Sequence, residues 1–132
     1  VGEDGVNDVR SGDGGDGIES NITGTPTYRG GGGAGLASNT SAAEGVGGLG
    51  GGGDSDEDSN GGDGVANTGG GGAGSRAIYN SGSGGSGVVI LKYPKAFTIT
   101  PGAGLTSSTS TVGEFKVTTV TAGSDTVSFA TS

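Results

Sequence analysis

This chain of 132 residues contains 35 glycines, carries a formal net charge of −8 and lacks Cys, His, Met and Trp. Without Cys and His it can form no disulfide and no Cys/His zinc site, and it has no imidazole or thiolate for catalysis, so we predict that it is not an enzyme. Its acidic balance repels phosphate, and no apolar run approaches the ~20 residues of a transmembrane helix, so we expect neither nucleic-acid binding nor membrane insertion.

Glycines and acidic residues are concentrated before residue 87, which predicts a glycine-rich domain at 1–87 and a small module at 88–132. The first part shows no helical or alternating apolar pattern. Its low hydrophobicity and high net charge are typical of disorder, which is one interpretation of this part. Because the chain begins with Val1 rather than Met, we expect a processed product or an excerpt of a longer protein.

A period of three residues in the first part favours a second interpretation. Arg10, Asp13, Asp16 and Glu19 are spaced three apart. A left-handed helix of the polyproline II type has three residues per turn and no internal hydrogen bonds, and glycine can form the same helix as polyglycine II. The amides of such helices must find partners in neighbouring helices, and only glycine allows the close approach. The fold class expected is therefore a bundle of polyglycine II helices followed by a small all-β module, with little or no α-helix.

The glycine runs of this bundle are predicted at 11–18, 29–36, 45–53, 61–66, 68–75 and 82–87. If successive runs alternate in direction, the loops 19–28, 54–60 and 75–81 gather at one end. Tyr and Arg are frequent binding anchors, so that end is a candidate receptor-binding surface. Its proposed contact residues are Tyr28, Arg29, Arg76 and Tyr79, and the alternative is that these loops are solvated turns.

Two weaker motifs lie in the loops of the glycine-rich part. Asp54, Asp56 and Asp58 have the first three ligand spacings of an EF-hand loop, which suggests calcium as a candidate cofactor, although a solvated acidic turn is the alternative. Asn21 and Asn39 each open an Asn-X-Ser/Thr glycosylation sequon, a triplet that also arises by chance in sequence rich in Ser and Thr.

Four short runs with the character of β-strands make up the second part: 88–93, 96–100, 114–121 and 125–130. A Ser/Thr-rich segment at 102–113 is interpreted as a loop. With three Phe in the whole chain, about 45 residues form a marginal core, so we expect support from the first part of the chain or from a neighbouring subunit, either in a homo-oligomer or among other subunits of a larger assembly. Val127 and Phe129, on the terminal strand, are the predicted oligomer interface, packed against a neighbouring subunit or against 88–91.

The phrases "ANTGGGG" (66–72) and "GGSGVVILKYP" (84–94), with "GEFKVTTVTAGSDTVSFA" (113–130), resemble the glycine-rich domain of bacteriophage tail-fibre and adhesin-type structural proteins. The resemblance covers the chain from about residue 12 to residue 130. It implies a sandwich of polyglycine II helices whose loops bind a cell-surface receptor, and a location on the virion surface or outside the cell.

We therefore expect a structural and recognition subunit of a tail fibre or of a similar extracellular appendage. The alternative is a purely architectural subunit of an extracellular filament that is held together by strand pairing between subunits. An ice-binding protein, which is a third use of polyglycine II bundles, is disfavoured because the chain lacks disulfides and flat, regular Thr/Ala faces.

Overall fold

The computed structural model describes residues 2, 5, 10–37 and 43–131. The chain divides into two compact units, Val1–Glu19 with Thr27–Gly87 and Ser20–Pro26 with Val88–Ser132. We call the first the glycine unit and the second the β unit. Within the described residues the regular elements are all strands, so the expected all-β module and the expected absence of α-helix are confirmed at this level. No helix in the described part of the chain could cross a membrane.

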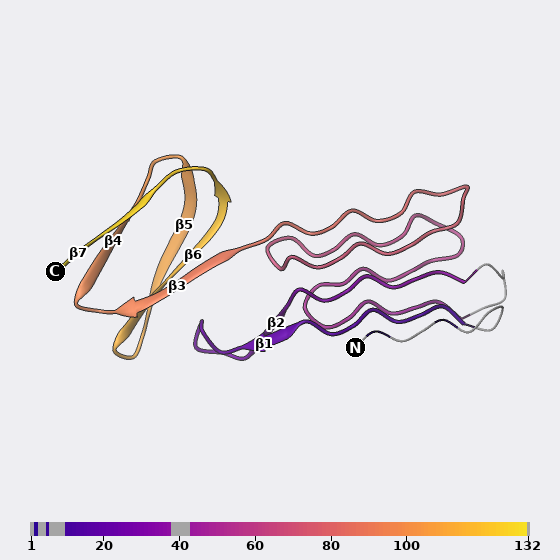
Figure 1. The fold of residues 1–132 in the computed structure, drawn as a ribbon, viewed down its shortest axis with the longest axis horizontal. Helices are drawn as coiled ribbons and strands as arrows, with labels where there is room; N and C mark the ends of the chain where they lie inside the picture. The colour runs from indigo at the N-terminus through magenta and orange to yellow at the C-terminus, as the bar shows by residue number, and fades with distance from the viewer. Residues whose placement is uncertain (1, 3–4, 6–9, 38–42, 132) are drawn as a thin grey trace. The chain divides into compact units, whose positions relative to one another are not determined.

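In the part of the chain that the structure describes, seven strands form three small sheets (Figure 1). They are β1 (Ile18–Ser20), β2 (Thr27–Arg29), β3 (Val89–Pro94), β4 (Phe97–Pro101), β5 (Leu105–Val112), β6 (Phe115–Gly123) and β7 (Val127–Thr131). β1 pairs with β2, the antiparallel order β3-β6-β5 makes the largest sheet, and β4 pairs antiparallel with β7.

β5 corrects one sequence prediction, because the Ser/Thr-rich segment interpreted as a loop is an eight-residue strand. Thr is a favourable strand residue, and here its hydroxyls also bond across the sheet. Thr109 Oγ1 lies 2.7 Å from Thr118 Oγ1, which lies 2.9 Å from the Tyr93 hydroxyl. Thr118 is fully buried, so this chain of hydroxyls supplies its hydrogen bonds.

The core of the β unit lies between its two sheets. Tyr93 and Ile99 are buried there, whereas Val117, which is also buried, lies on the opposite face of β6 from Thr118 and Tyr93. The Tyr93 ring meets the Phe129 ring edge to face, with centroids 5.3 Å apart, and Ile99 is the register partner of Phe129. β7 pairs with β4 of the same chain in a two-stranded sheet, so the prediction that this terminal strand also lies against another subunit stays a prediction.

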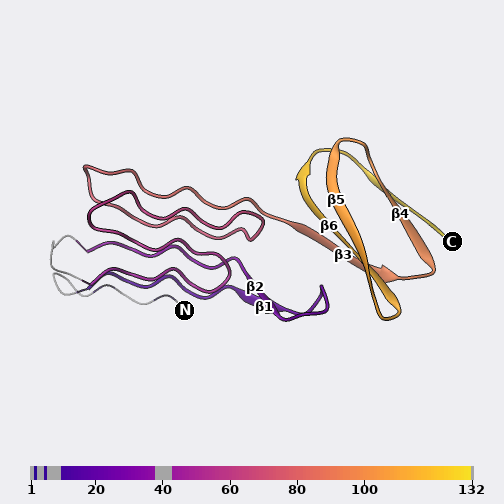
Figure 2. The ribbon, with the colours of Figure 1, turned by 180° about the vertical axis from the view of Figure 1, so that it is seen from behind.

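The glycine unit consists of extended runs that lie side by side, as Figures 1 and 2 show from opposite directions. We name them run A (11–17), run B (30–36), run C (43–49), run D (51–55), run E (61–65), run F (69–74) and run G (82–87). Backbone hydrogen bonds between runs recur at every third residue: Ser11, Gly14 and Gly17 donate to Ala43, Val46 and Leu49, at 2.8–2.9 Å.

These bonds arrange the runs in two rows. Runs A, B, F and G are bonded in that order in the first row, and runs C, D and E in the second. Each run of the second row also bonds to two neighbours in the first: run C to A and B, run D to B and F, and run E to F and G. The rows are therefore staggered, so that runs far apart in sequence share a layer.

The turn at Gly50 and Gly51 corrects a second prediction. The segment 45–53 was expected to be a single run, but the chain reverses there, with φ of 102° at Gly50 and 95° at Gly51. These angles lie in the region that favours glycine. Runs C and D are then antiparallel neighbours, joined from Gly52 N to the Gly48 carbonyl (3.1 Å) and from Ser55 N to the Gly45 carbonyl (3.0 Å).

Candidate functional site

The loops that follow runs D and F meet at one end of the glycine unit, which we call the loop end. The Asn80 amide donates to the Asn60 side chain at 2.9 Å. Arg76 Nη2 lies 3.0 Å from Glu57 Oε2, with the two side chains 21% and 27% exposed. A tight turn brings Arg76 and Tyr79 together, because the Tyr79 amide donates to the Arg76 carbonyl at 2.9 Å. The predicted contact residues Arg76 and Tyr79 thus share one loop.

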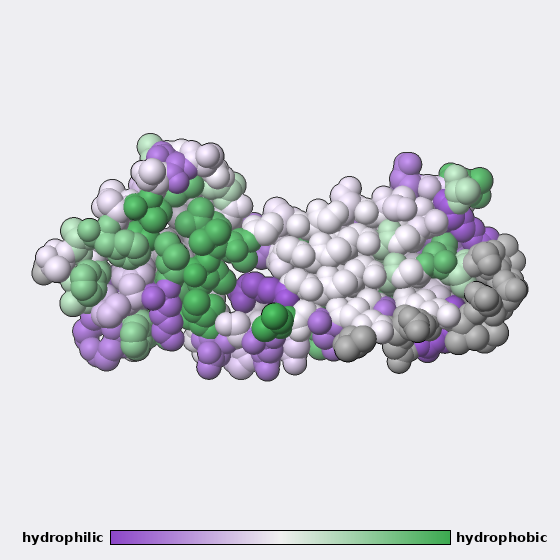
Figure 3. All heavy atoms as spheres, viewed as in Figure 1, coloured by the Kyte–Doolittle hydropathy of each residue, from purple (hydrophilic) through white to green (hydrophobic). Residues whose placement is uncertain are grey.

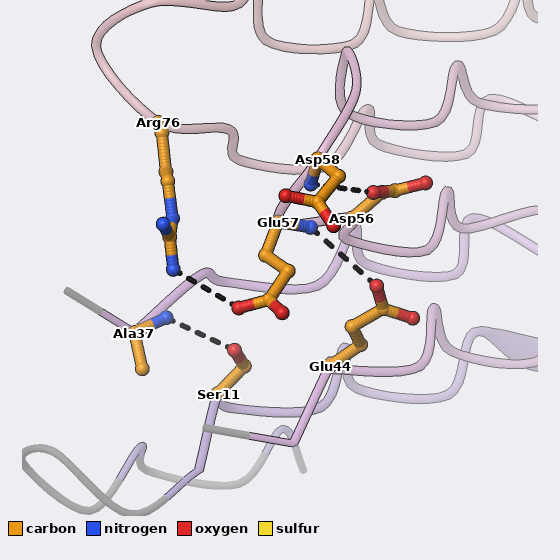
Figure 4. A network of polar contacts seen from close by, with 7 residues as sticks. All are labelled: Ser11, Ala37, Glu44, Asp56, Glu57, Asp58 and Arg76. Carbon is orange, nitrogen blue, oxygen red and sulfur yellow. Dashed lines mark hydrogen bonds and ion pairs between the residues drawn. The ribbon is translucent and has the colours of Figure 1, made fainter. Parts of the chain in front are cut away.

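Figure 4 shows the polar contacts of this end. Arg76 reaches across to Glu57, and the Ala37 amide donates to the Ser11 hydroxyl at 2.9 Å. Arg76 Nε is buried without a hydrogen-bond partner among the described residues. A buried donor left unpaired costs about 1–3 kcal/mol.

A cavity of about 420 Å³ opens beside Arg76. Its lining combines aliphatic groups with one guanidinium and one hydroxyl, and consists of Leu36, Ala37, Ser75, Arg76, Ala77 and Ile78. Ile78 is 81% exposed, so its side chain is open to contact from outside. An apolar hollow with a small number of polar groups is the usual composition of a small-ligand site. Leu36 and Ile78 could not be singled out from the sequence, because single apolar residues in loops are common.

The structure places Tyr28 and Arg29 away from the loop end. A Cβ at Gly50 would lie 2.8 Å from the Arg29 backbone, so Arg29 is beside the turn between runs C and D. Run D leads away from that turn to Glu57. The prediction that the loops 19–28, 54–60 and 75–81 gather at one end is therefore wrong for Tyr28 and Arg29. Because the chain makes an extra reversal at residues 50 and 51, every later run has the direction opposite to the predicted one.

The period-three acidic residues of run A bond to neighbouring backbone amides. Asp13 Oδ1 accepts from Val46 N at 2.8 Å, and Asp16 Oδ1 accepts from Leu49 N at 2.7 Å. In the same way, Asp54 Oδ1 accepts from Gly47 N and Asp63 Oδ1 from Ser83 N, both at 2.7 Å. These carboxylates act as side-chain caps for amides that have no neighbouring run to bond to.

Replacing Asp16 by Ala should destabilise the glycine unit by about 0.5–2 kcal/mol, the usual cost of losing a side-chain cap of this kind. Asp16→Asn keeps an acceptor oxygen and should recover most of the stability. Hydrogen exchange at the Leu49 amide measures both effects. Equal protection of this amide in the Ala variant and the parent chain would contradict the capping role.

A family model described as a glycine-rich domain matches residues 1–94. The chain belongs to this glycine-rich domain family. Among the curated proteins and among the solved structures that were compared with it, none matches. The family match covers the whole glycine unit and β3, whereas the resemblance of the chain to tail-fibre proteins rests on the sequence phrases given above.

The acidic loop of this glycine-rich domain does not bring its carboxylates together. Asp54 bonds to Gly47, and Asp56 Oδ1 accepts from Asp58 N at 2.8 Å. The pKa of Asp56 is lowered, first by the Ser59 hydroxyl and then by the Asp58 amide. In the described part of the chain, no group of three acidic side chains is placed to hold a metal ion. Calcium binding by Asp54, Asp56 and Asp58 stays a prediction.

The remaining predicted sites are placed as follows. Asn21 is exposed, directly before the turn that joins β1 to β2, while Asn39 lies outside the described residues. Val127 and Phe129 lie on β7 and are 38% and 51% exposed, although Phe129 also contacts Tyr93. Their role in an oligomer interface is not tested by these contacts within one chain.

Proposed function

We propose that this glycine-rich domain is a recognition subunit of an extracellular appendage of the tail-fibre or adhesin type, and that its loop end binds a cell-surface receptor. In this proposal the glycine runs are polyglycine II helices. The three-residue recurrence of the bonds between runs supports this conformation, because a helix with three residues per turn returns each amide to the same side after three residues.

The cavity beside Arg76 is the observation that carries the proposal. A receptor with an apolar face could cover Leu36 and Ile78 and contact the Arg76 side chain, which is 21% exposed. The ion pair with Glu57 holds the guanidinium at the rim, so that binding would not first have to order a free Arg side chain.

The experiment compares adsorption of the labelled chain to a panel of bacterial cell envelopes with that of two variants. Arg76→Ala should reduce binding about tenfold or more, as for a binding anchor. Tyr28→Ala, at the opposite end of the glycine unit, is the matched control and should bind like the parent chain. The proposal fails if no envelope binds the chain, or if both variants lose binding equally while their amide protection is unchanged.

A second candidate function is the purely architectural filament subunit. It is favoured by the inner face of the β4–β7 sheet, where Phe97, Val127 and Phe129 remain 38–51% exposed. Figure 3 shows a broad apolar surface on the β unit and a pale, nearly neutral surface on the glycine unit. A subunit that covers the exposed aromatic face would gain about 25 cal/mol per Å² of apolar surface.

A further inference from the structure

The outer face of the first row of runs has backbone amides that donate to none of the described residues. In run B, Gly32 and Gly35 donate to run A, and Gly31 and Ala34 donate towards the second row, at Gly50 and Gly53. Gly30 donates to Thr68, and the Gly33 amide, in the middle of the run, donates to none of the described residues. Because successive amides of a three-residue helix point about 120° apart, the Gly33 amide points away from the second row.

Run F repeats the pattern. Gly71 and Gly74 donate to run B, Ala73 donates to run E, and the Gly72 amide is left without an acceptor in the described chain. In run G, Gly82 and Gly85 donate to run F and Ser83 donates to Asp63, whereas the Gly84 amide has no acceptor among the described residues. The amides of Gly33, Gly72 and Gly84 therefore form a line of donors across three adjacent runs. Run C, by contrast, has its outward amides capped by Asp13, Asp16 and Asp54.

We propose that this bare glycine face, formed by runs B, F and G, docks against the same face of a second copy of the chain. An acceptor carbonyl can reach these amides only if the partner backbone comes as close as the runs of the bundle are to one another. Inside the bundle that spacing leaves no room for a Cβ: a Cβ at Gly33 would lie 2.1 Å from the Gly72 carbonyl oxygen. The partner surface must therefore be free of side chains as well, and this chain itself carries such a surface.

Charge also favours a second copy. Runs B, F and G contain no charged residue, although the chain has a net charge of −8. Joining two of these faces brings no like charges into direct contact, whereas the Asp-capped side of the bundle would repel its own copy. A basic partner would select the Asp-capped side instead.

The size of the face indicates a weak contact. Six residues at ~3.1 Å each and three runs spaced ~4.8 Å apart give about 270 Å² per copy, far below the roughly 800 Å² of a stable interface. We therefore expect association of the free chain only at high concentration, and a stronger effect where a fibre holds several copies close together.

Sedimentation equilibrium of the full chain, from micromolar to millimolar concentration, tests the proposal. The average mass should rise with concentration, and the amides of Gly33 and Gly72 should become protected from hydrogen exchange over the same range. Gly84→Glu places a charged side chain on the face without a clash inside the bundle, because the Cβ would lie 3.7 Å from its nearest neighbour, the Gly70 oxygen. This variant should stay monomeric.

Ala66→Glu is the matched control, since it adds the same charge in an exposed turn off the face. It should associate like the parent chain. Gly35→Glu, whose Cβ would lie 3.8 Å from the nearest atom, gives a second variant on run B and should also stay monomeric. The proposal is overturned if the parent chain is monomeric at millimolar concentration. It is equally overturned if Gly84→Glu associates like the control, because the contact then lies elsewhere, for example on the β unit.

Discussion

Gly70→Ala is expected to unfold most of the glycine unit, because a Cβ at residue 70 would lie 2.0 Å from the Gly51 carbonyl oxygen. The obstacle is backbone, which cannot rotate away like a side chain. Run F bonds to runs B, D, E and G, so a shift of run F would lengthen hydrogen bonds to all four. We expect a loss of at least about 3 kcal/mol, at or above the upper end for overpacking of a core.

Hydrogen exchange across runs B, D, E and F is the measurement for this variant. The matched control is Gly84→Ala, the same chemical change at a position where the new Cβ meets only the Gly70 oxygen, at 3.7 Å. The control should keep the protection of the parent chain, and could gain slightly from the lower entropy of its unfolded state. If both variants exchange alike, the glycine runs are a linker and the packed arrangement is incorrect.

The sequence contained the period of the glycine unit but not its connectivity. The three-residue spacing of Asp13 and Asp16 predicted a three-residue helix, and the structure gives those side chains bonds to amides that are themselves three apart. The reversal at Gly50 and Gly51 was not predictable, because in "GGLGGGG" the sequence does not distinguish a glycine that forms a turn from one that continues an extended run. Only the register between runs C and D distinguishes them.

The candidate site was only half predictable for the same reason. Arg76 and Tyr79 are close in sequence, so their shared turn follows from local structure. Their association with Glu57 needs the correct direction of runs D and F, and the cavity also needs Leu36 from run B. A turn that is missing from the prediction inverts the predicted direction of every later run. The prediction therefore placed Tyr28 and Arg29 at the same end as Arg76, whereas they lie at the opposite end of the glycine unit.

The β unit was easier to predict where its strands contain apolar residues. β3, β4, β6 and β7 each begin within two residues of a predicted run, because Val, Ile and Phe mark them. β5 was missed because the residues between Leu105 and Val112 are exposed Ser and Thr, and the side-chain contact of Thr109 with β6 is a hydroxyl bond to Thr118 rather than an apolar contact. Polar strands of this kind carry no alternating apolar signal.

Tyr93→Ala should destabilise the β unit by about 3–5 kcal/mol, the usual cost of removing a buried aromatic side chain. It removes both the edge-to-face contact with Phe129 and the hydroxyl bond to Thr118. Tyr93→Phe keeps the ring and loses only the hydroxyl, and because Thr118 retains Thr109 as a partner, the cost should be near 1 kcal/mol. Hydrogen exchange of the β6 amides measures these differences within the β unit, where one melting temperature would mix the two units. Equal losses in both variants would mean that the hydroxyl chain, and not the Phe129 contact, holds the two sheets together.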